Sequence, residues 1–206
     1  MKKLLPLIFS LFFISSHSVF ADDISDFEIE GISIGDSLLD YMTEDEILEE
    51  IELNKNYYSY LNEPNKYVEV YLFKDFLTYD RMSFFIKNNS TNQYVTNKNE
   101  KYTILSIFGS ISYIEDFNSC KQKRDEISEV LSGMFPNEQL QESNRSHRSD
   151  PSGNSIIDGF YFDFDSGASI DGYCSNFEET FRIKNNMTEG LNLSISSAEI
   201  VDWFLN

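Results

Sequence analysis

Segments with the composition of β-strands come in two uninterrupted runs, and each run follows a helical segment. The first run has strand candidates at 67–73, 77–86 and 102–114, and the second at 156–165, 168–173, 177–183 and 191–195. Neighbouring strands without intervening helices favour antiparallel pairing, with the helices packed on one face of the sheet. The sequence therefore predicts an α+β fold with an antiparallel sheet of about six to seven strands. The helix-plus-strand unit occurs over 36–114 and again over 118–195, which indicates two halves, although they share no residue-level repeat.

Helix start signals flank these runs of strands. Thr43-x-x-Glu46 and Ser196-x-x-Glu199 both have the capping-box pattern, which predicts a helix after Thr43 and a short terminal helix. A short helical segment is expected over 36–41, and a longer helix from Asn118 or Ser119 to Ser132. Residues 137–155 are polar and rich in turn formers, so no regular element is predicted there.

The N-terminus has the layout of a secretory signal peptide. Lys2 and Lys3 precede an apolar stretch over 4–14, and Val19-Phe20-Ala21 resembles a signal peptidase site. The apolar stretch is shorter than the roughly 20 residues that a membrane-spanning helix needs, and no second stretch reaches that length. We expect cleavage near Ala21 and one soluble α+β domain over 22–206 that is periplasmic or secreted.

Cys120 and Cys174 are the only cysteines, and an even number in an exported chain indicates a disulfide bond. The helical face that carries Cys120 also carries the apolar residues Ile127, Val130, Leu131 and Met134. Cys174 shares its strand parity with Ile170, so both thiols should point into the core. A redox-active dithiol would have the Cys-x-x-Cys spacing, so a structural disulfide is predicted.

Acidic residues outnumber basic ones by 35 to 16, which gives a formal net charge of −19 at pH 7. Loss of Lys2 and Lys3 with the signal peptide would make the remaining chain still more negative. Such a polyanion is repelled by nucleic acid and by anionic lipid surfaces. We therefore expect a partner protein or a cationic small molecule, no nucleic acid and no membrane span. The sequence indicates no cofactor, with calcium as the one candidate.

His147 is the only histidine in residues 22–206, so a histidine-based active site would have to use it. A Ser-His-Asp hydrolase would need Asp150 to orient His147 and a serine such as Ser152 or Ser155 as its nucleophile. However, no Gly-x-Ser-x-Gly elbow follows a strand, and triad members normally come from separate elements. The alternative is a solvated loop in which the residues 150–153 form a turn.

Asp163, Asp165 and Asp171 flank a Ser166-Gly167 turn and are candidate ligands for calcium, which binds carboxylate oxygens. Their spacing departs from the EF-hand loop in the positions of its glycine and its last acidic residue. A β-hairpin explains the same stretch without a metal. That hairpin would bury Phe160, Phe162 and Phe164. Zinc is not expected, because one histidine and two oxidised cysteines cannot supply its usual ligands.

Tyrosines cluster at Tyr57, Tyr58, Tyr60, Tyr67 and Tyr71. Exposed tyrosines offer a large contact area at low entropic cost and are enriched at recognition surfaces. The alternative is that they pack half-buried on the sheet, where aromatic residues are common. We take these five residues as candidates for ligand binding.

Five stretches form a further sequence pattern: Gly31-Ile-Ser-Ile-Gly-Asp-Ser-Leu-Leu-Asp-Tyr41, Thr43-x-x-Glu46-Ile47, Tyr79-Asp80, Tyr102-x-Ile104-x-Ser106-Ile107-x-Gly109 and Cys120-x-x-Lys123-x-x-Glu126-Ile127. Together they resemble a group of uncharacterised exported bacterial proteins. The resemblance spans most of residues 22–206 and implies no particular activity. The order of elements is also similar in outline to β-lactamase-inhibitor-protein-like modules, which are mostly interaction or assembly domains. Likeness of fold alone assigns no function.

The sequence contains no assembled catalytic set, which favours a non-enzymatic binding or interaction module over an enzyme. Its binding surface is expected around residues 57–71, together with the loop 145–155. Two alternatives stay open: a hydrolase that uses His147, and a calcium-dependent binding protein. Arg145 and Arg148 beside His147 would suit an anion, but nothing else in the sequence supports that use.

Overall fold

Seven strands form one antiparallel sheet in the computed structural model, which describes residue 24 and residues 27–56, 66–88 and 101–206. The strands are β3 (Tyr67–Leu72), β4 (Arg81–Lys87), β5 (Ile104–Ser112), β6 (Leu140–Ser146), β7 (Ile156–Asp163), β8 (Ser169–Asn176) and β9 (Gly190–Ser196). Their spatial order is β3-β4-β5-β9-β8-β7-β6. The strands β1 (Glu28–Ile29) and β2 (Ile32–Ser33) form a separate small hairpin. The fold is therefore α+β with an antiparallel sheet, which confirms the predicted fold class.

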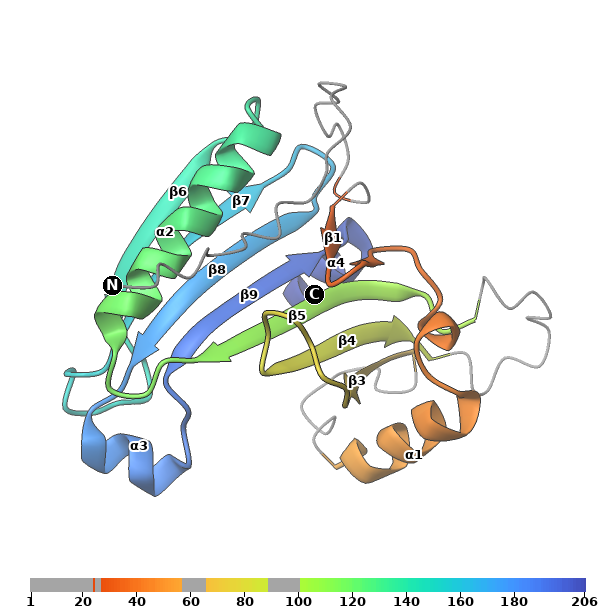
Figure 1. Ribbon diagram of the computed structural model, residues 1–206, viewed down its shortest axis with the longest axis horizontal. Helices are drawn as coiled ribbons and strands as arrows, with labels where there is room; N and C mark the ends of the chain where they lie inside the picture. The colour runs from red at the N-terminus through yellow and green to blue at the C-terminus, as the bar shows by residue number, and fades with distance from the viewer. Residues whose placement is uncertain (1–23, 25–26, 57–65, 89–100) are drawn as a thin grey trace, which may run out of the picture.

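The two helix-plus-strand stretches meet between β5 and β9. Helix α1 (Glu44–Asn54) precedes β3, β4 and β5, and helix α2 (Phe117–Met134) precedes the other four strands. β5 pairs with β9 from Ser106↔Ser196 to Ser112↔Gly190, so the strands form one curved sheet (Figure 1). The apolar stretch 102–114 thus supplies an interior strand with a neighbour on each side.

Helices α1 and α2 cover the same face of the sheet. α2 packs on β7, β8 and β9, and α1 packs on β3 (Figure 1). Successive strand residues point to opposite faces, so every second side chain faces these helices. The main core lies on this side and includes Ile47, Val70, Phe84, Ile107, Phe162 and Ile195. Among the described helices, none combines the length and the apolar character that a membrane crossing requires.

The predicted disulfide is present. Cys120 of α2 is bonded to Cys174 of β8, with their Cα atoms 5.9 Å apart. Both cysteines are buried and pack with Leu191 of β9. Val130, which was predicted on the same buried helix face as Cys120, is instead 60% exposed. A disulfide of this kind fits an extracellular, oxidising environment.

The capping-box predictions hold for α1 but not for the terminal helix α4 (Ala198–Leu205). Thr43 Oγ1 accepts the Glu46 N–H at 3.3 Å, and Glu46 Oε2 accepts the Thr43 N–H at 2.8 Å. α4 begins after Ser197, whose hydroxyl makes no cap bond. The side chains of Ser196 and Glu199 bond to β5 and β3 instead. The box predicted at 196–199 is therefore wrong, because the sheet engages both of its side chains.

Two helical segments differ in extent from their predictions. The one expected over 36–41 is a single 3₁₀ turn, η2 (Leu38–Asp40). Helix α2 begins earlier than expected, because the Asp116 carboxylate accepts the Ser119 N–H at 3.2 Å and caps it. A capping carboxylate satisfies a backbone donor that the helix itself leaves unpaired.

Two predictions of element type are wrong. The stretch 177–183, predicted as a strand, lies largely in helix α3 (Glu179–Asn185). Glu178 begins this helix, since its Oε2 accepts the Phe181 N–H at 2.7 Å. The polar stretch 137–155, predicted without a regular element, contains β6. β6 is an edge strand paired only with β7, and polar, exposed residues are typical of such edges.

Candidate functional site

The second face of the sheet is largely uncovered within the part of the chain that the structure describes. Helix α4 covers one end of it, where Ile200 packs against Tyr67, Phe85 and Leu105. This is a departure from the prediction that all helices pack on one face. Directly opposite residues in antiparallel strands point to the same side. The strand registers therefore show which side chains share the uncovered face.

One row of side chains crosses the uncovered face from β4 to β6. Its members, each opposite the next, are Arg81, Ser110, Asn192, Tyr173, Gly159 and Ser143. Tyr173 is 37% exposed in the middle of this row. A Cβ atom at Gly159 would lie 2.7 Å from the Tyr173 Cβ and 2.6 Å from the Gly172 carbonyl oxygen, so the tyrosine needs a glycine beside it. The row thus forms a largely polar surface around the Tyr173 ring.

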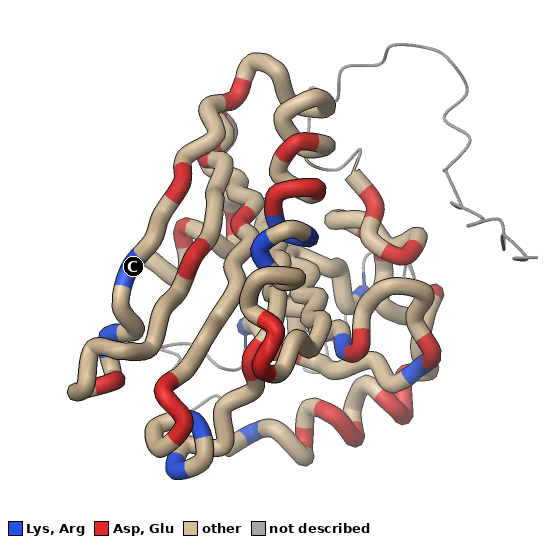
Figure 2. Tube along the Cα trace, turned by 60° about the vertical axis from the view of Figure 1, so that its left-hand side comes forward, with Lys and Arg blue, Asp and Glu red and all other residues tan. Residues whose placement is uncertain are grey.

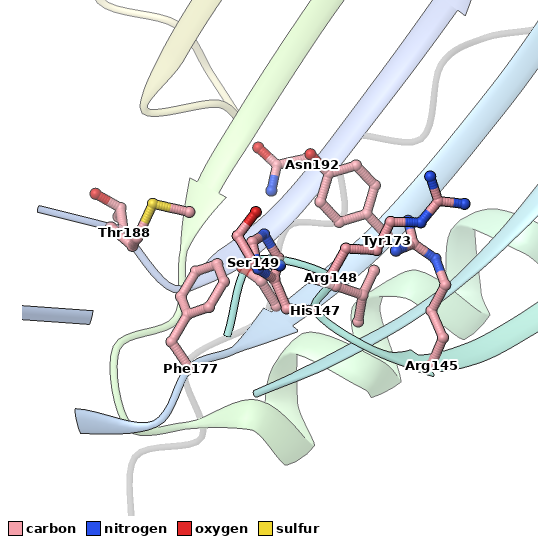
Figure 3. Close-up of a pocket in the computed structure, with 11 residues that line it drawn as sticks. Arg145, His147, Arg148, Ser149, Tyr173, Phe177, Thr188 and Asn192 are labelled. Carbon is pink, nitrogen blue, oxygen red and sulfur yellow. Dashed lines mark hydrogen bonds between the residues drawn. The ribbon is translucent and has the colours of Figure 1, made fainter. Parts of the chain in front are cut away.

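A pocket of about 440 Å³ opens on this face beside the loop that follows β6 (Figure 3). The side chains that line it include Arg145, His147, Arg148, Tyr173, Thr188 and Asn192. Figure 3 shows Arg145 and Arg148 extending toward the side of the pocket that Tyr173 occupies. We call this site the basic pocket. It combines three basic side chains with hydroxyl, amide and aromatic groups.

The basic pocket contrasts with the acidic character of the protein. The full sequence has a formal net charge of −19, and acidic positions recur along much of the described chain in Figure 2. Among the described residues, no Asp or Glu lines the pocket. Arg145 and Arg148 also form no ion pair with any residue that the structure describes. Guanidinium groups stay charged, so two of them at one site without a counter-ion favour an anion there.

Asp150 holds the loop that carries two of these basic side chains. Its carboxylate accepts the Ser152 N–H at 2.9 Å, the Ser152 hydroxyl at 2.8 Å and the Ser155 N–H at 2.9 Å. Hydrogen bonds from Ser155, and then from Ser152, hold the pKa of Asp150 well below its usual range. Ser155 Oγ also accepts the Glu178 N–H at 2.9 Å, which ties the loop to the start of α3. The loop therefore presents its basic side chains from a well-anchored backbone.

Another part of the lining of the basic pocket depends on Glu189. This residue is buried, and its carboxylate accepts the Phe177 N–H at 2.8 Å and the Glu115 N–H at 3.0 Å. Phe177 and Thr188, which precedes Glu189 in the chain, both line the pocket. One buried carboxylate thus helps to position two of the lining residues.

His147, Asp150 and Ser152 lie in one loop but are not joined as a catalytic triad. His147 Nδ1 accepts the Ser149 N–H at 3.3 Å, whereas a triad needs Nδ1–H to donate to the carboxylate. The Ser152 hydroxyl donates to Asp150 rather than to the histidine. The His147 ring packs against Phe177 instead, with their centroids 5.5 Å apart. The described geometry thus supplies no assembled catalytic set for the hydrolase hypothesis.

The three aspartates considered for calcium lie on the β7–β8 hairpin, which forms as predicted. Asp165 is exposed in the turn, Asp163 accepts from Gln141 at 3.4 Å, and Asp171 accepts the Ser194 hydroxyl at 2.6 Å. No group of three or more His, Cys, Asp or Glu that could hold a metal ion occurs among the described residues. The hairpin buries the predicted set Phe160, Phe162 and Phe164.

Asp171 should make the protein less stable as the pH rises. Burial raises the pKa of its carboxyl above the ordinary value of 3.8, against the lowering effect of the hydrogen bond from Ser194. The folded state therefore binds this proton more tightly than the unfolded state. The free energy of unfolding falls as the pH rises from the ordinary pKa toward and through the higher pKa of the folded state. We expect Asp171→Asn, which cannot ionise, to raise the urea midpoint at pH 7 relative to the unmodified protein.

The gain from Asp171→Asn should shrink as the pH is lowered toward 4, because the aspartate is then increasingly protonated in the folded state. Asp165→Asn at the exposed turn is the matched control and should leave the midpoint unchanged at both pH values. A gain for Asp171→Asn that is the same at pH 7 and pH 4 would contradict the ionisation argument.

The structure describes two of the five tyrosines expected to form a recognition surface. Tyr67 is buried beneath α4, and its hydroxyl donates to Glu199 at 2.8 Å. Tyr71 lies half-buried on the uncovered face and lines a smaller hollow beside the basic pocket. The other three, Tyr57, Tyr58 and Tyr60, lie outside the described residues.

Tyr173, Thr188 and Asn192 are lining residues of the basic pocket that sequence reasoning did not single out. A signal existed for Tyr173, because it precedes Cys174, whose inward direction on the strand implies an outward one for its neighbour. Thr188 and Asn192 reach the pocket only because β9 pairs with β8, with Asn192 opposite Tyr173. Such a long-range pairing cannot be read from local patterns.

Comparison with protein-family models, with curated proteins and with solved structures finds no match to this chain. The resemblances noted in the sequence therefore stay predictions. Any functional conclusion has to rest on the geometry and chemistry of the uncovered face.

Proposed function

We propose that this protein is an exported, non-enzymatic binding module that holds a carboxylate group of a partner protein in the basic pocket. Export is supported by the signal-peptide layout of the N-terminus and by the disulfide. A periplasmic or secreted location would supply the oxidising conditions that the disulfide needs. The partner's carboxylate would come from an acidic side chain or from a chain end.

The observation that carries this proposal is the composition of the pocket. Arg145, His147 and Arg148 line it, and no described acidic residue does. Arginine binds carboxylates through two parallel hydrogen bonds, which gives geometric specificity as well as energy. Tyr173 and Asn192 add an aromatic surface and an amide at the same site. A cation would find no described carboxylate in this pocket, so the pocket does not support the cationic ligand expected from net charge.

The net charge also limits what kind of anion can bind. A polyanion would be repelled by a chain with a net charge of −19. At physiological ionic strength, exposed charges farther apart than about 8 Å are largely screened from each other. A compact carboxylate on an otherwise neutral segment would therefore gain the local attraction of the arginines with little long-range repulsion. Tyrosine and arginine are also enriched at protein interfaces, which favours a protein segment as the ligand.

The first test compares two peptides that differ in one charge. Acetyl-tetraglycine with a free C-terminal carboxylate should shift backbone amide signals around Arg145 and Arg148 in an NMR titration. The same peptide with a C-terminal amide should bind at least about tenfold more weakly, because hydrogen bonds to charged groups contribute about 1.5–3 kcal/mol.

Arg145→Gln/Arg148→Gln should reduce the affinity for the carboxylate peptide to that of the amide peptide. Lys55→Gln/Lys123→Gln removes the same charge from two helix surfaces on the covered side and serves as the control. Equal affinities for the two peptides, or full binding by the arginine double variant, would overturn the proposal.

A further inference from the structure

A second hollow continues the basic pocket across the uncovered face toward β4. Its volume is about 180 Å³, and it shares Tyr173 and Asn192 with the basic pocket. Its other lining residues include Arg81, Ser110 and Phe108. The two hollows thus form one trough that runs across the strands.

Arg81 is the cationic group at the far end of this trough. Arg81 is exposed and forms no ion pair with any residue that the structure describes. Glu69 lines the same hollow, and its backbone lies opposite Phe85, four residues from Arg81 along β4. Its carboxylate is held at Ser83, two residues or about 7 Å from Arg81 along the strand. There Glu69 Oε1 accepts the Ser83 hydroxyl at 2.7 Å. The arginine is therefore placed to receive an external anion.

The spacing along the trough defines the length of a ligand that reaches both ends. The row from Arg81 through Ser110 and Asn192 to Tyr173 crosses from β4 to β8. Three steps between neighbouring strands, at about 4.8 Å each, amount to roughly 14 Å from Arg81 to Tyr173. The backbone of Arg145 lies two strands farther, on β6, and its side chain extends back toward Tyr173 (Figure 3). An extended peptide covers this distance with about four residues at 3.3–3.6 Å each. Ser110 and Asn192 lie between the two ends and can bond to the polar backbone of such a peptide.

We infer that Arg81 is a second carboxylate anchor, and that the trough binds an extended segment with acidic groups about four residues apart. This inference rests on the proposed function, since it takes the basic pocket as the first anchor. The proposed ligand is thereby narrowed from any segment with one carboxylate to a short, extended segment with two carboxylates.

The experiment compares succinyl-tetraglycine, which has a carboxylate at each end, with acetyl-tetraglycine, which has one. The unmodified protein should bind the succinyl peptide about fivefold more tightly, the gain expected of one exposed ion pair near 1 kcal/mol. Arg81→Gln should abolish this advantage and leave the affinity for acetyl-tetraglycine unchanged. Succinyl-glycine is too short to reach both anchors and should bind no better than the acetyl peptide.

Lys87→Gln, at the other end of β4, removes the same charge near α4 and should keep the fivefold advantage. The inference is overturned when both peptides bind alike, or when the advantage survives in Arg81→Gln. Those results leave the proposed function intact, because acetyl-tetraglycine still binds through Arg145 and Arg148. Failure of both peptides to bind would instead overturn both the proposed function and the second anchor.

Discussion

We expect Cys120→Ala/Cys174→Ala to lose roughly 4 kcal/mol of unfolding free energy. The bond closes a loop with a sequence separation of 54 residues, and cross-linking such a loop restricts the unfolded chain. It also joins α2 to β8, the strand that carries Tyr173 into the basic pocket. The loss would be a large fraction of the 5–15 kcal/mol that is typical of a folded domain.

Urea unfolding at pH 7 measures this loss, and reduced wild-type protein separates its two causes. Reduction removes the cross-link but keeps both sulfur atoms in the core, whereas the alanine variant also loses their packing with Leu191. We expect the reduced protein to lose most of the stability and the alanine variant somewhat more. A variant that unfolds at the same urea concentration as the oxidised protein would show that the bond adds nothing to the fold.

The fold class follows from features that are local in the sequence. The runs of β-branched and aromatic residues, the Thr43 capping box and the inward parity of Cys174 all depend on residues within a few positions of one another. The failures share a different cause. β6 is polar because it is an edge strand, and the 196–199 box is lost because its side chains bond across the sheet. Local sequence patterns indicate neither the edge position of β6 nor the hydrogen bonds that Ser196 and Glu199 make across the sheet.

The candidate site could be predicted only in part for the same reason. Arg145, at the end of β6, and His147 and Arg148, in the loop that follows, are close in sequence, so their grouping is visible without a structure. Tyr173 and Asn192 come from two other strands, and they meet the loop because β9 pairs with β8 and β8 with β7. The second face of the sheet carries polar residues that a sequence pattern describes simply as exposed. Only the strand order shows that they line one trough.

Gly190→Ala should cost about 3 kcal/mol, the upper part of the usual range for overpacking a well-packed site. Gly190 begins β9 and pairs with Ser112 of β5 and with Ser175 of β8, at the join between the two groups of strands. A Cβ atom there would lie 2.1 Å from the Ile111 carbonyl oxygen and 3.1 Å from the Ser112 Cα. These are backbone atoms, so relief requires β5 and β9 to move apart.

Two other glycines provide graded controls for Gly190→Ala in urea unfolding. At Gly109 the added Cβ would meet the Tyr79 ring at 2.5 Å, and a side chain can move more readily than a paired strand, so a smaller loss is expected. At Gly133 in α2 nothing lies within 4 Å, so alanine should be neutral or stabilise the helix by up to about 1 kcal/mol. Equal losses at Gly190 and Gly109 would contradict the argument that backbone contact makes the difference. The predicted order, with Gly190 worst and Gly133 harmless, would show that close backbone contact at the join between β5 and β9 requires a glycine there.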